Sequence, residues 1–246
     1  MILLEVIESE FGTINIVQKR DNGVITYMQG GCCQSEADRN GISLASYIHA
    51  LYGLLFQAKA RKILLIGCGG GTLATMLSRA RCKVTIVDVN PISFALAKQY
   101  FDLPPSVECH VRDGKSFLRS DTAVYDAIVL DAFHGDRIPS HLQSLRFFGL
   151  IRDRLAQRGV VLANVHVQHD SDGLPDRIAG NMANVWPEVR LLDSEGFFGR
   201  NAVVMAGRVA NLLPPYVIVP PETEANVIDK ELATMRYRPW RTSCAF

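Results

Sequence analysis

The chain has 246 residues, of which 48% are hydrophobic and 21% are charged, enough to bury the core of one large domain. Its 26 lysine and arginine residues almost balance 25 aspartate and glutamate residues, so the net charge of +1 creates no field that would attract nucleic acid or an anionic membrane. The longest apolar run, about 42–56, is shorter than the ~20 residues that a membrane helix needs. We therefore expect neither a dedicated DNA-binding protein nor a membrane-spanning segment.

The N-terminus, beginning at Met1, lacks the basic segment, long apolar segment and small-residue cleavage site of a secretory signal. This pattern predicts a cytoplasmic protein. The six cysteines form no C-x-x-C pair and are predicted to be free thiols. No set of cysteines and histidines has the spacing of zinc ligands, so we expect no metal site.

The first 40 residues (1–40) are predicted to form a small lobe of β-hairpins. Its β-prone runs, 4–8, 13–18 and 24–28, are separated by turn signals. Near-helical spacing of apolar residues over 42–57 predicts a helix that leaves this lobe. At the other end, two proline pairs, Pro214-Pro215 and Pro220-Pro221, predict an extended C-terminal tail over 211–246.

Between these segments, over residues 41–210, short apolar runs alternate with helical patterns. This alternation is typical of a parallel sheet covered on both faces by crossover helices, a Rossmann-like α/β domain. The expected strands are 63–66, 83–87, 107–111, 127–130 and 160–164, with a closing antiparallel hairpin at 189–192 and 202–206. The expected helices are 73–81, 91–101, 115–119, 139–157 and 174–185.

The first core strand runs into a glycine-rich turn that contains Gly67, Gly69 and Gly71. Glycines there let the backbone approach a ligand, and the helix that follows offers unpaired N–H groups. Asp88 ends the second strand, where a carboxylate can accept hydrogen bonds from ribose hydroxyls. The pattern predicts an adenosine-containing ligand, with a merely tight turn as the alternative. Because Gly69 to Ala74 also fits a dinucleotide fingerprint, NAD is a rival ligand.

Acidic residues also end the third and fourth strands. Asp113, followed by Gly114, can accept a hydrogen bond from an adenine amino group, which favours an S-adenosylmethionine-type ligand over NAD; alternatively, Asp113 only caps the next helix. Asp131 precedes a glycine-containing loop, and partial burial of such a carboxyl suits a general base. Asp131 could equally cap a helix or order the loop.

Together these motifs resemble those of the spermidine synthase family, the polyamine aminopropyltransferases, over residues from about 5 to 207. The similar segments are Glu8 to Ile14 (family E-S-x-Y-G), Gly30 to Gln34 (D-G-x-x-Q), Gly67 to Gly71, Val87-Asp88, Asp113-Gly114 and Tyr125 to Asp131. The resemblance implies an S-adenosylmethionine-dependent methyltransferase-type Rossmann fold behind the N-terminal lobe, and a homodimer.

The resemblance also implies an activity, the transfer of an aminopropyl group from decarboxylated S-adenosylmethionine to an amine, without a metal. Gln34, Asp88, Asp113 and Gly114 would hold the nucleoside of this donor or of the methylthioadenosine product. Asp131, which matches the first Asp of the family's D-S-S-D loop, would take a proton from the attacking amine. Desolvation by a closing loop, residues 133–139, would raise the basicity of Asp131.

Three acids that the family places around its cationic amines are absent. Gly70 replaces the acid of G-G-G-D-G, His134 replaces the second Asp of D-S-S-D, and Tyr47-Ile48-His49 replaces Y-x-E. Tyr47 and His134 are still expected on the acceptor side, and His134 and His49 could act as acid or base or could simply be loop and helix residues. Since a buried ammonium without a carboxylate is costly, an S-adenosylmethionine-dependent methyltransferase and a non-catalytic nucleoside-binding module remain alternatives.

Overall fold

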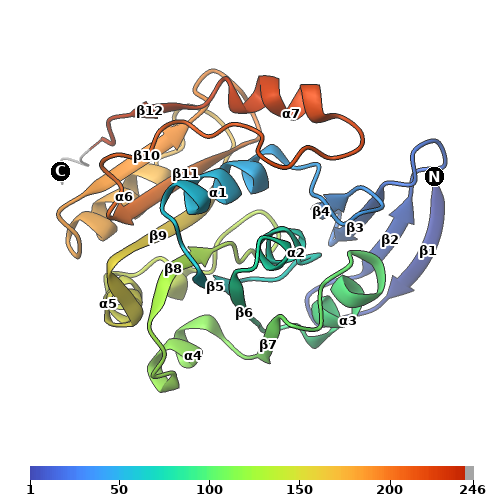
Figure 1. Cartoon of the computed structure of the whole chain (residues 1–246), viewed down its shortest axis with the longest axis horizontal. Helices are drawn as coiled ribbons and strands as arrows, with labels where there is room; N and C mark the ends of the chain where they lie inside the picture. Colours follow the sequence, from blue (N-terminus) through green and yellow to red (C-terminus); the bar gives the residue numbers. More distant parts are fainter. Residues whose placement is uncertain (242–246) are drawn as a thin grey trace.

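The computed structural model describes residues 1–241, which form a small antiparallel sheet beside a large mixed sheet (Figure 1). The end of the predicted tail, with Cys244, lies outside the described residues. The five cysteines within the described part are free thiols. Across residues 1–241, no helix has the length and apolar character needed to cross a membrane.

The small sheet has four antiparallel strands in the order β1 (Ile2–Ile7), β2 (Ile14–Gln18), β3 (Ile25–Gln29) and β4 (Cys32–Ala37). Its buried face, including Ile16 and Tyr27, packs against Leu96 and Phe101 at α3 (Pro91–Tyr100). The sequence did not predict β4, because its residues show no alternation of polar and apolar side chains and follow two glycines. This strand carries Gln34 to the edge of the large sheet.

The large sheet has the order β12-β10-β11-β9-β8-β5-β6-β7. Its strands are β5 (Lys62–Ile66), β6 (Lys83–Asp88), β7 (Glu108–Val111), β8 (Tyr125–Leu130), β9 (Leu155–Val167), β10 (Val189–Asp193), β11 (Arg200–Gly207) and β12 (Arg236–Arg238). The strands from β5 to β9 pair in parallel, whereas β10, β11 and β12 pair antiparallel. The predicted parallel core and its closing antiparallel hairpin are therefore present.

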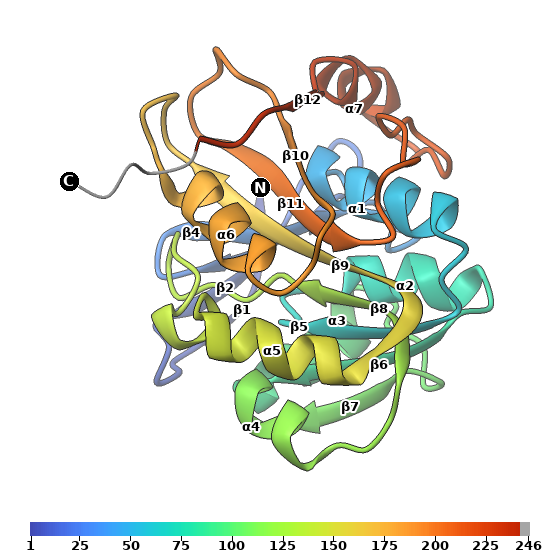
Figure 2. The ribbon, with the colours of Figure 1, turned by 90° about the vertical axis from the view of Figure 1, so that its left-hand side faces the viewer.

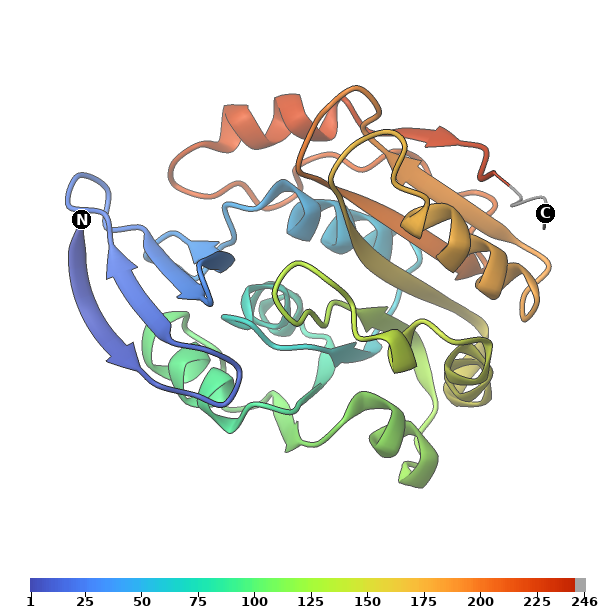
Figure 3. The same ribbon diagram turned by 180° about the vertical axis from the view of Figure 1, so that it is seen from behind.

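Helices cover both faces of this sheet (Figures 2 and 3). One face packs against α1 (Ser46–Gln57), α2 (Thr72–Arg79), α3 and α7 (Ala225–Leu232). The other packs against α4 (Gly114–Ser120), α5 (Leu145–Arg154) and α6 (Leu174–Ala183). A hydrophobic core lies on each face of the sheet, and alternate residues of a strand point into one or the other. In β5, Leu65 packs in the core beneath α1 and α2, and Leu64 packs in the core beneath α4 and α5. A strand buried on both faces must be apolar throughout, which is the pattern found in the sequence.

Two expectations about the secondary structure are wrong. The helix expected over 139–157 is instead a short 3-10 turn, η1 (Ser140–Leu142), followed by α5, because the Ser144 side chain accepts a hydrogen bond from the N–H of Phe147 and starts a new helix. The expected extended tail contains α7 and β12, and β12 pairs with β10. The proline-rich segment before α7 is irregular, and Pro215 packs on Gly53 of α1.

Candidate active site

The site lies where the neighbouring strands β5 and β8 end, because the chain leaves them toward opposite sides of the sheet. Open α/β sheets bind ligands at this switch point. Gly67 follows β5 and Asp131 follows β8, and the Asp131 N–H donates to the Ile66 carbonyl at 2.8 Å. Gly67 has φ of 106°, and a Cβ there would lie 2.0 Å from the Asp131 carbonyl oxygen. Only glycine fits at this close approach of the two loops.

A cavity of about 480 Å³ opens at this edge, and we call it the large cavity. It brings together residues from six separate segments of the chain. The predicted residues among its lining are Gln34, Gly67, Gly69, Asp88, Asp113, Gly114, Asp131 and His134. Its volume lies in the range of cavities that enclose small-molecule ligands.

Asp88 is fixed against the glycine-rich turn. One carboxylate oxygen accepts from the N–H of Cys68 at 2.7 Å, and the other accepts from the N–H of Asn90 at 2.8 Å. Burial raises the pKa of Asp88, although these backbone hydrogen bonds counteract the rise. Since a carboxylate has about four acceptor sites, Asp88 retains acceptor capacity toward the cavity.

Asp113 has two partners, and one of them was not predicted. Its Oδ1 accepts from the N–H of Ser116 at 2.8 Å, so Asp113 caps the following helix, and its other carboxylate oxygen faces elsewhere. Its Oδ2 lies 2.7 Å from Nε2 of His141, a residue of η1. Burial alone would raise the pKa of Asp113, but the hydrogen bonds from His141 and Ser116 outweigh burial and hold this pKa below its usual value. The next residue, Gly114, leaves no room for a Cβ, which would lie 2.5 Å from Ile66.

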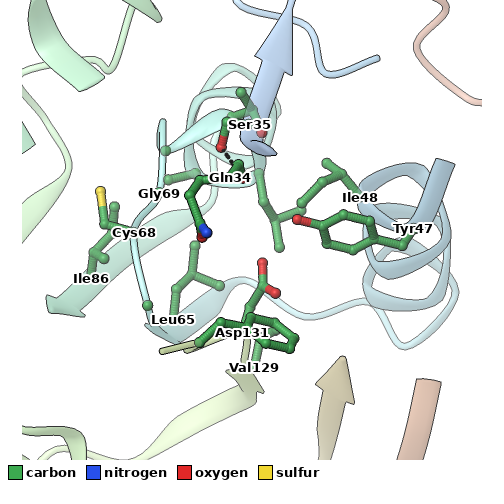
Figure 4. A pocket seen from close by; sticks show the side chains of 16 residues that line it. Gln34, Ser35, Tyr47, Ile48, Leu65, Cys68, Gly69, Ile86, Val129 and Asp131 are labelled. Atoms are coloured by element: carbon green, nitrogen blue, oxygen red, sulfur yellow. Dashed lines mark hydrogen bonds between the residues drawn. The ribbon is translucent and has the colours of Figure 1, made fainter. Parts of the chain in front are cut away.

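A much smaller space of about 40 Å³, which we call the neck, adjoins the large cavity. Both spaces are lined by Gln34 and Asp131, and the neck is also lined by Tyr47 and Gly71. Figure 4 shows the Tyr47 hydroxyl and the Asp131 carboxylate facing the same space, with the Gln34 amide across from Asp131. The neck is too small for anything beyond the reacting atoms of two ligands or a few waters.

Beyond the neck lies a third space of about 360 Å³, the side cavity. It shares Tyr47 with the neck. Its other lining residues come from the start of α1, from the β10–β11 connection and from α7, and they include Phe197, Phe198, Asn201 and Glu231. The neck, with Asp131 and Tyr47, therefore lies between two larger cavities.

Asp131 is the carboxyl group with the most altered ionisation at this edge. Burial raises its pKa to about 6, although Asn164 opposes this rise by donating from Nδ2 to the Asp131 Oδ1 at 2.8 Å. The next helical turn begins at Ser140 and has no side-chain cap, so Asp131 is not its cap. A carboxyl group with such a pKa can accept a proton near neutral pH.

The three positions that lack the family acids differ in their surroundings. The Gly70 N–H donates to the Ser35 hydroxyl at 2.8 Å, and a Cβ at Gly70 would lie 2.9 Å from the Ser35 Cβ and 3.0 Å from the Phe101 ring. His49 is buried with its Nε2 2.7 Å from the Ser43 carbonyl oxygen, and it lines none of the three cavities. His134 is exposed at the rim of the large cavity. The interpretation in which His49 joins His134 as acid or base is therefore wrong.

Some residues that shape the site gave no local signal in the sequence. Ser35, His141, Asn164 and Asn201 reach it through contacts with residues at least 28 positions away in the chain. Within residues 1–241, no group of three or more histidine, cysteine, aspartate or glutamate side chains is placed to hold a metal ion.

Comparison with known proteins places these features in a family context. A family model described as a methyltransferase domain matches residues 63–169. A polyamine aminopropyltransferase from Vibrio vulnificus is 35% identical over 121 residues, which cover 46% of this chain and 40% of that protein. A probable polyamine aminopropyl transferase from Bifidobacterium longum is 30% identical over 151 residues, which cover 58% of this chain and 34% of that protein. Over these segments the chain is similar in sequence to polyamine aminopropyltransferases.

The likeness to a solved structure extends over almost the whole chain. The crystal structure of a probable spermidine synthase from Corynebacterium glutamicum superimposes with a TM-score of 0.78 at 20% identity, covering 98% of this chain and 92% of that one. This likeness, with the methyltransferase-domain match, confirms the predicted methyltransferase-type α/β fold with its small N-terminal sheet. The chain matches less than half the length of the two aminopropyltransferase relatives named above.

Proposed function

We propose that this protein is a transferase of the aminopropyltransferase type, which moves an aminopropyl group from decarboxylated S-adenosylmethionine to an amine acceptor. The observation that carries this proposal is the position of Asp131. Its carboxyl group, with a pKa of about 6, lines a neck between two larger cavities. A base at that point stands between a ligand in one cavity and a ligand in the other.

The large cavity would hold the nucleoside of the donor. Asp88 would accept hydrogen bonds from the ribose hydroxyls, and Asp113 with the backbone of Gly114 would recognise adenine. Gln34 and the glycine-rich turn, with Gly67, Gly69 and Gly71, would border the sulfonium end. The presence of these residues around one space is the support for this assignment.

The chemistry needs one base. An acceptor ammonium first gives a proton to the Asp131 carboxylate, which leaves a lone pair on nitrogen. The lone pair then attacks the methylene carbon next to the sulfonium, so that the C–N bond forms while the C–S bond breaks. The bonding electrons return to sulfur, and the neutral thioether methylthioadenosine leaves. No metal or redox partner is needed for this displacement.

The side cavity would receive the rest of the acceptor, with Tyr47 at its entrance to the neck and His134 at the rim on the donor side. Phe197, Phe198 and other apolar residues form much of its wall, and Glu231 is the one carboxylate among its lining residues. Such a wall offers few partners for a second ammonium. We therefore propose an amine acceptor without restricting it to the polyamines.

We further propose that the protein works as a cytoplasmic homodimer without nucleic acid or membrane partners. The near-neutral net charge supports the absence of polyanionic partners. The edge strand β1 supports the dimer, because Leu3 in it is 59% exposed and β2 is its one strand partner in the described chain.

Methyl transfer from intact S-adenosylmethionine is the second candidate. It is favoured by the methyltransferase-domain match and by Gly70, where no carboxylate is present to face the ammonium of an aminopropyl group. Both reactions would use the same nucleoside cavity. They differ in the donor, which is decarboxylated S-adenosylmethionine for aminopropyl transfer and intact S-adenosylmethionine for methyl transfer.

Calorimetry and transfer assays test these assignments. We expect methylthioadenosine and decarboxylated S-adenosylmethionine to bind more tightly than S-adenosylmethionine, and transfer to an amine panel to increase as pH rises through about 6, where Asp131 ionises. Asp131→Asn should retain the affinity for methylthioadenosine and lower the transfer rate at least 100-fold, in the range of general-base catalysis.

Other outcomes have definite meanings. Methyl transfer from S-adenosylmethionine in place of aminopropyl transfer would establish the second candidate. Nucleoside binding without transfer from either donor would identify a binding module. If NAD binds and none of the three nucleosides does, the assignment of the large cavity is wrong.

A further inference from the structure

A line of two buried amides connects Asp131 with the side cavity. Asn164 lies on β9 and is 1% exposed, and its Nδ2 donates to the Asp131 Oδ1 at 2.8 Å. Asn201 lies on the neighbouring strand β11, and its Nδ2 donates to the Asn164 Oδ1 at 2.9 Å. Asn201 itself lines the side cavity.

We infer that Asn164 and Asn201 are positioning residues, which hold the Asp131 carboxylate in its proton-accepting orientation. This inference goes beyond the general-base role of Asp131 and rests on the proposed function. Asn164 occupies Oδ1 of Asp131, which leaves the other carboxylate oxygen for the neck. A base fixed in this way needs no reorganisation when the acceptor arrives.

Asn201 decides which end of the Asn164 amide faces Asp131. The two ends of an amide have almost the same shape, but one donates hydrogen bonds and the other accepts them. Because Asn201 donates to the Asn164 oxygen, the Asn164 nitrogen must point to the carboxylate. With Asn201 removed, the Asn164 amide loses the partner that fixes its oxygen, so the hydrogen bond to the carboxylate is less firmly held and the ionised base is less favoured.

The ionisation of Asp131 thus depends on two opposing effects, burial, which raises its pKa, and the Asn164 hydrogen bond, which lowers it. Two other titratable side chains line the neck, Tyr47 from α1 and Cys68 from the glycine-rich turn. Neither of them is basic. On the large-cavity side the titratable and charged residues are Asp88, Arg112, Asp113, His134 and His141, and on β9 His166 lies two residues beyond Asn164. Among residues 1–241, Asn164 is the one side chain that donates a hydrogen bond to Asp131.

The test is the pH dependence of two quantities, kcat/KM for transfer and the chemical shift of the Asp131 carboxyl carbon. The NMR signal is measured in protein labelled at the aspartate carboxyl carbons and is assigned by its absence in Asp131→Asn. We expect Asn164→Ala to move both titrations upward by about one pH unit. At pH 6, kcat/KM then falls about fivefold, while its plateau at high pH is retained.

Asn201→Ala should produce a smaller shift in the same direction, because the hydrogen bond to Asp131 can still form. Asn184→Ala is the matched control, since the Asn184 side chain is exposed and bonds only the Gly180 carbonyl among the described residues. It should leave both titrations unchanged. If Asn164→Ala does not fold, Asn201→Ala decides the question by the same two measurements.

An unchanged titration in Asn164→Ala and Asn201→Ala would overturn the inference. So would a kcat/KM that falls equally at every pH, because that result indicates a structural role alone. If the wild-type protein transfers nothing, the proposed function fails, and the NMR titration alone then supports or overturns the positioning role.

Discussion

Asp88, Asp113 and Asp131 each follow a parallel strand, but the three carboxyl groups have different partners. Asp88 accepts from two backbone N–H groups, Asp113 caps α4 and contacts His141, and Asp131 has a single amide donor. Burial raises the pKa of Asp88 and of Asp131. The pKa of Asp113 is instead lowered, because Asp113 has hydrogen-bond partners that outweigh burial. The least satisfied carboxyl group is thus the one with the surroundings of a base.

A base kept in this environment reduces stability. The pKa of Asp131 rises from 3.8 to about 6 in the folded protein. The folded state therefore binds the proton more tightly than the unfolded state, and the wild type loses stability as pH rises from about 4 to about 6. Above that range the loss is complete.

Asp131→Asn avoids this loss because its amide has no charge to bury. We expect its Tm to equal that of the wild type near pH 4 and to exceed it by a few degrees at pH 7.5, measured by scanning calorimetry. Asp229→Asn, at an exposed site on α7, is the control and should give no such pH-dependent difference. An equal change in Tm at both pH values would argue against a buried, destabilising charge at Asp131.

The sequence predicts the three carboxylates but not their partners. Each aspartate ends an apolar run, and the register of a parallel sheet brings such positions to one edge. The partners depend on contacts that no local pattern encodes. His141 meets Asp113 across 28 residues, and Asn164 meets Asn201 across 37 residues through the pairing of β9 with β11. In the sequence, Asn164 is simply the end of an apolar strand.

Among the secondary-structure elements, β12 shows how the C-terminal segment is attached. Arg238 on this strand donates to Asp193 of β10 and to Asp176 of α6. Arg200 of β11 also donates to Asp193, which is 2% exposed. Burial would raise the pKa of Asp193, but the two arginines hold it below its usual value. The last described strand is therefore fixed by buried ion pairs as well as by its backbone pairing.

Removing Arg238 leaves the buried Asp176 without its arginine side-chain donor and Asp193 with Arg200 alone. We expect Arg238→Met to lower the free energy of unfolding by about 3–5 kcal/mol, measured by urea denaturation at pH 7. Arg236→Met is the matched control on the same strand. Arg236 is exposed and, within residues 1–241, its side chain bonds only neighbouring carbonyls, so this change should alter stability by about 0.5 kcal/mol or less. A loss no larger than that of the control would show that β12 is attached by backbone pairing alone.

Predictions from the sequence succeeded for elements with a strong period and failed where tertiary contacts decide. The buried parallel strands were predicted because burial on both faces requires apolar residues throughout. Strand β4 was not predicted, since its polar residues pair with β3 and face the large sheet only in the folded protein. The tail was wrongly predicted as extended because its prolines end before α7 begins.

At the scale of the whole molecule, the small sheet leaves β1 as an open edge. Figure 1 shows β1 on the outer side of this sheet, away from the large sheet. Ile2, Leu3, Leu4 and Val6 are all exposed in it. An edge strand with apolar side chains is prone to pair with another strand unless it is covered.

This edge gives the proposed homodimer a direct test. We expect the wild type to sediment as a dimer and Leu3→Lys to shift it to a monomer at the same concentration, because a lysine on an edge strand disfavours strand pairing. Val227→Lys, at a similarly exposed site on α7, should remain dimeric. A monomeric wild type would reject the homodimer, and a dimeric Leu3→Lys would place the interface elsewhere.

The two larger cavities have no lining residue in common, whereas the neck of about 40 Å³ shares lining residues with each of them. Each also reaches the surface by itself, since exposed residues line both, His134 in the large cavity and Phe198 in the side cavity. A donor and an acceptor that enter by separate openings do not block each other's path. Under the proposed function, neither substrate would then have to bind first, and neither product would have to wait for the other before it leaves.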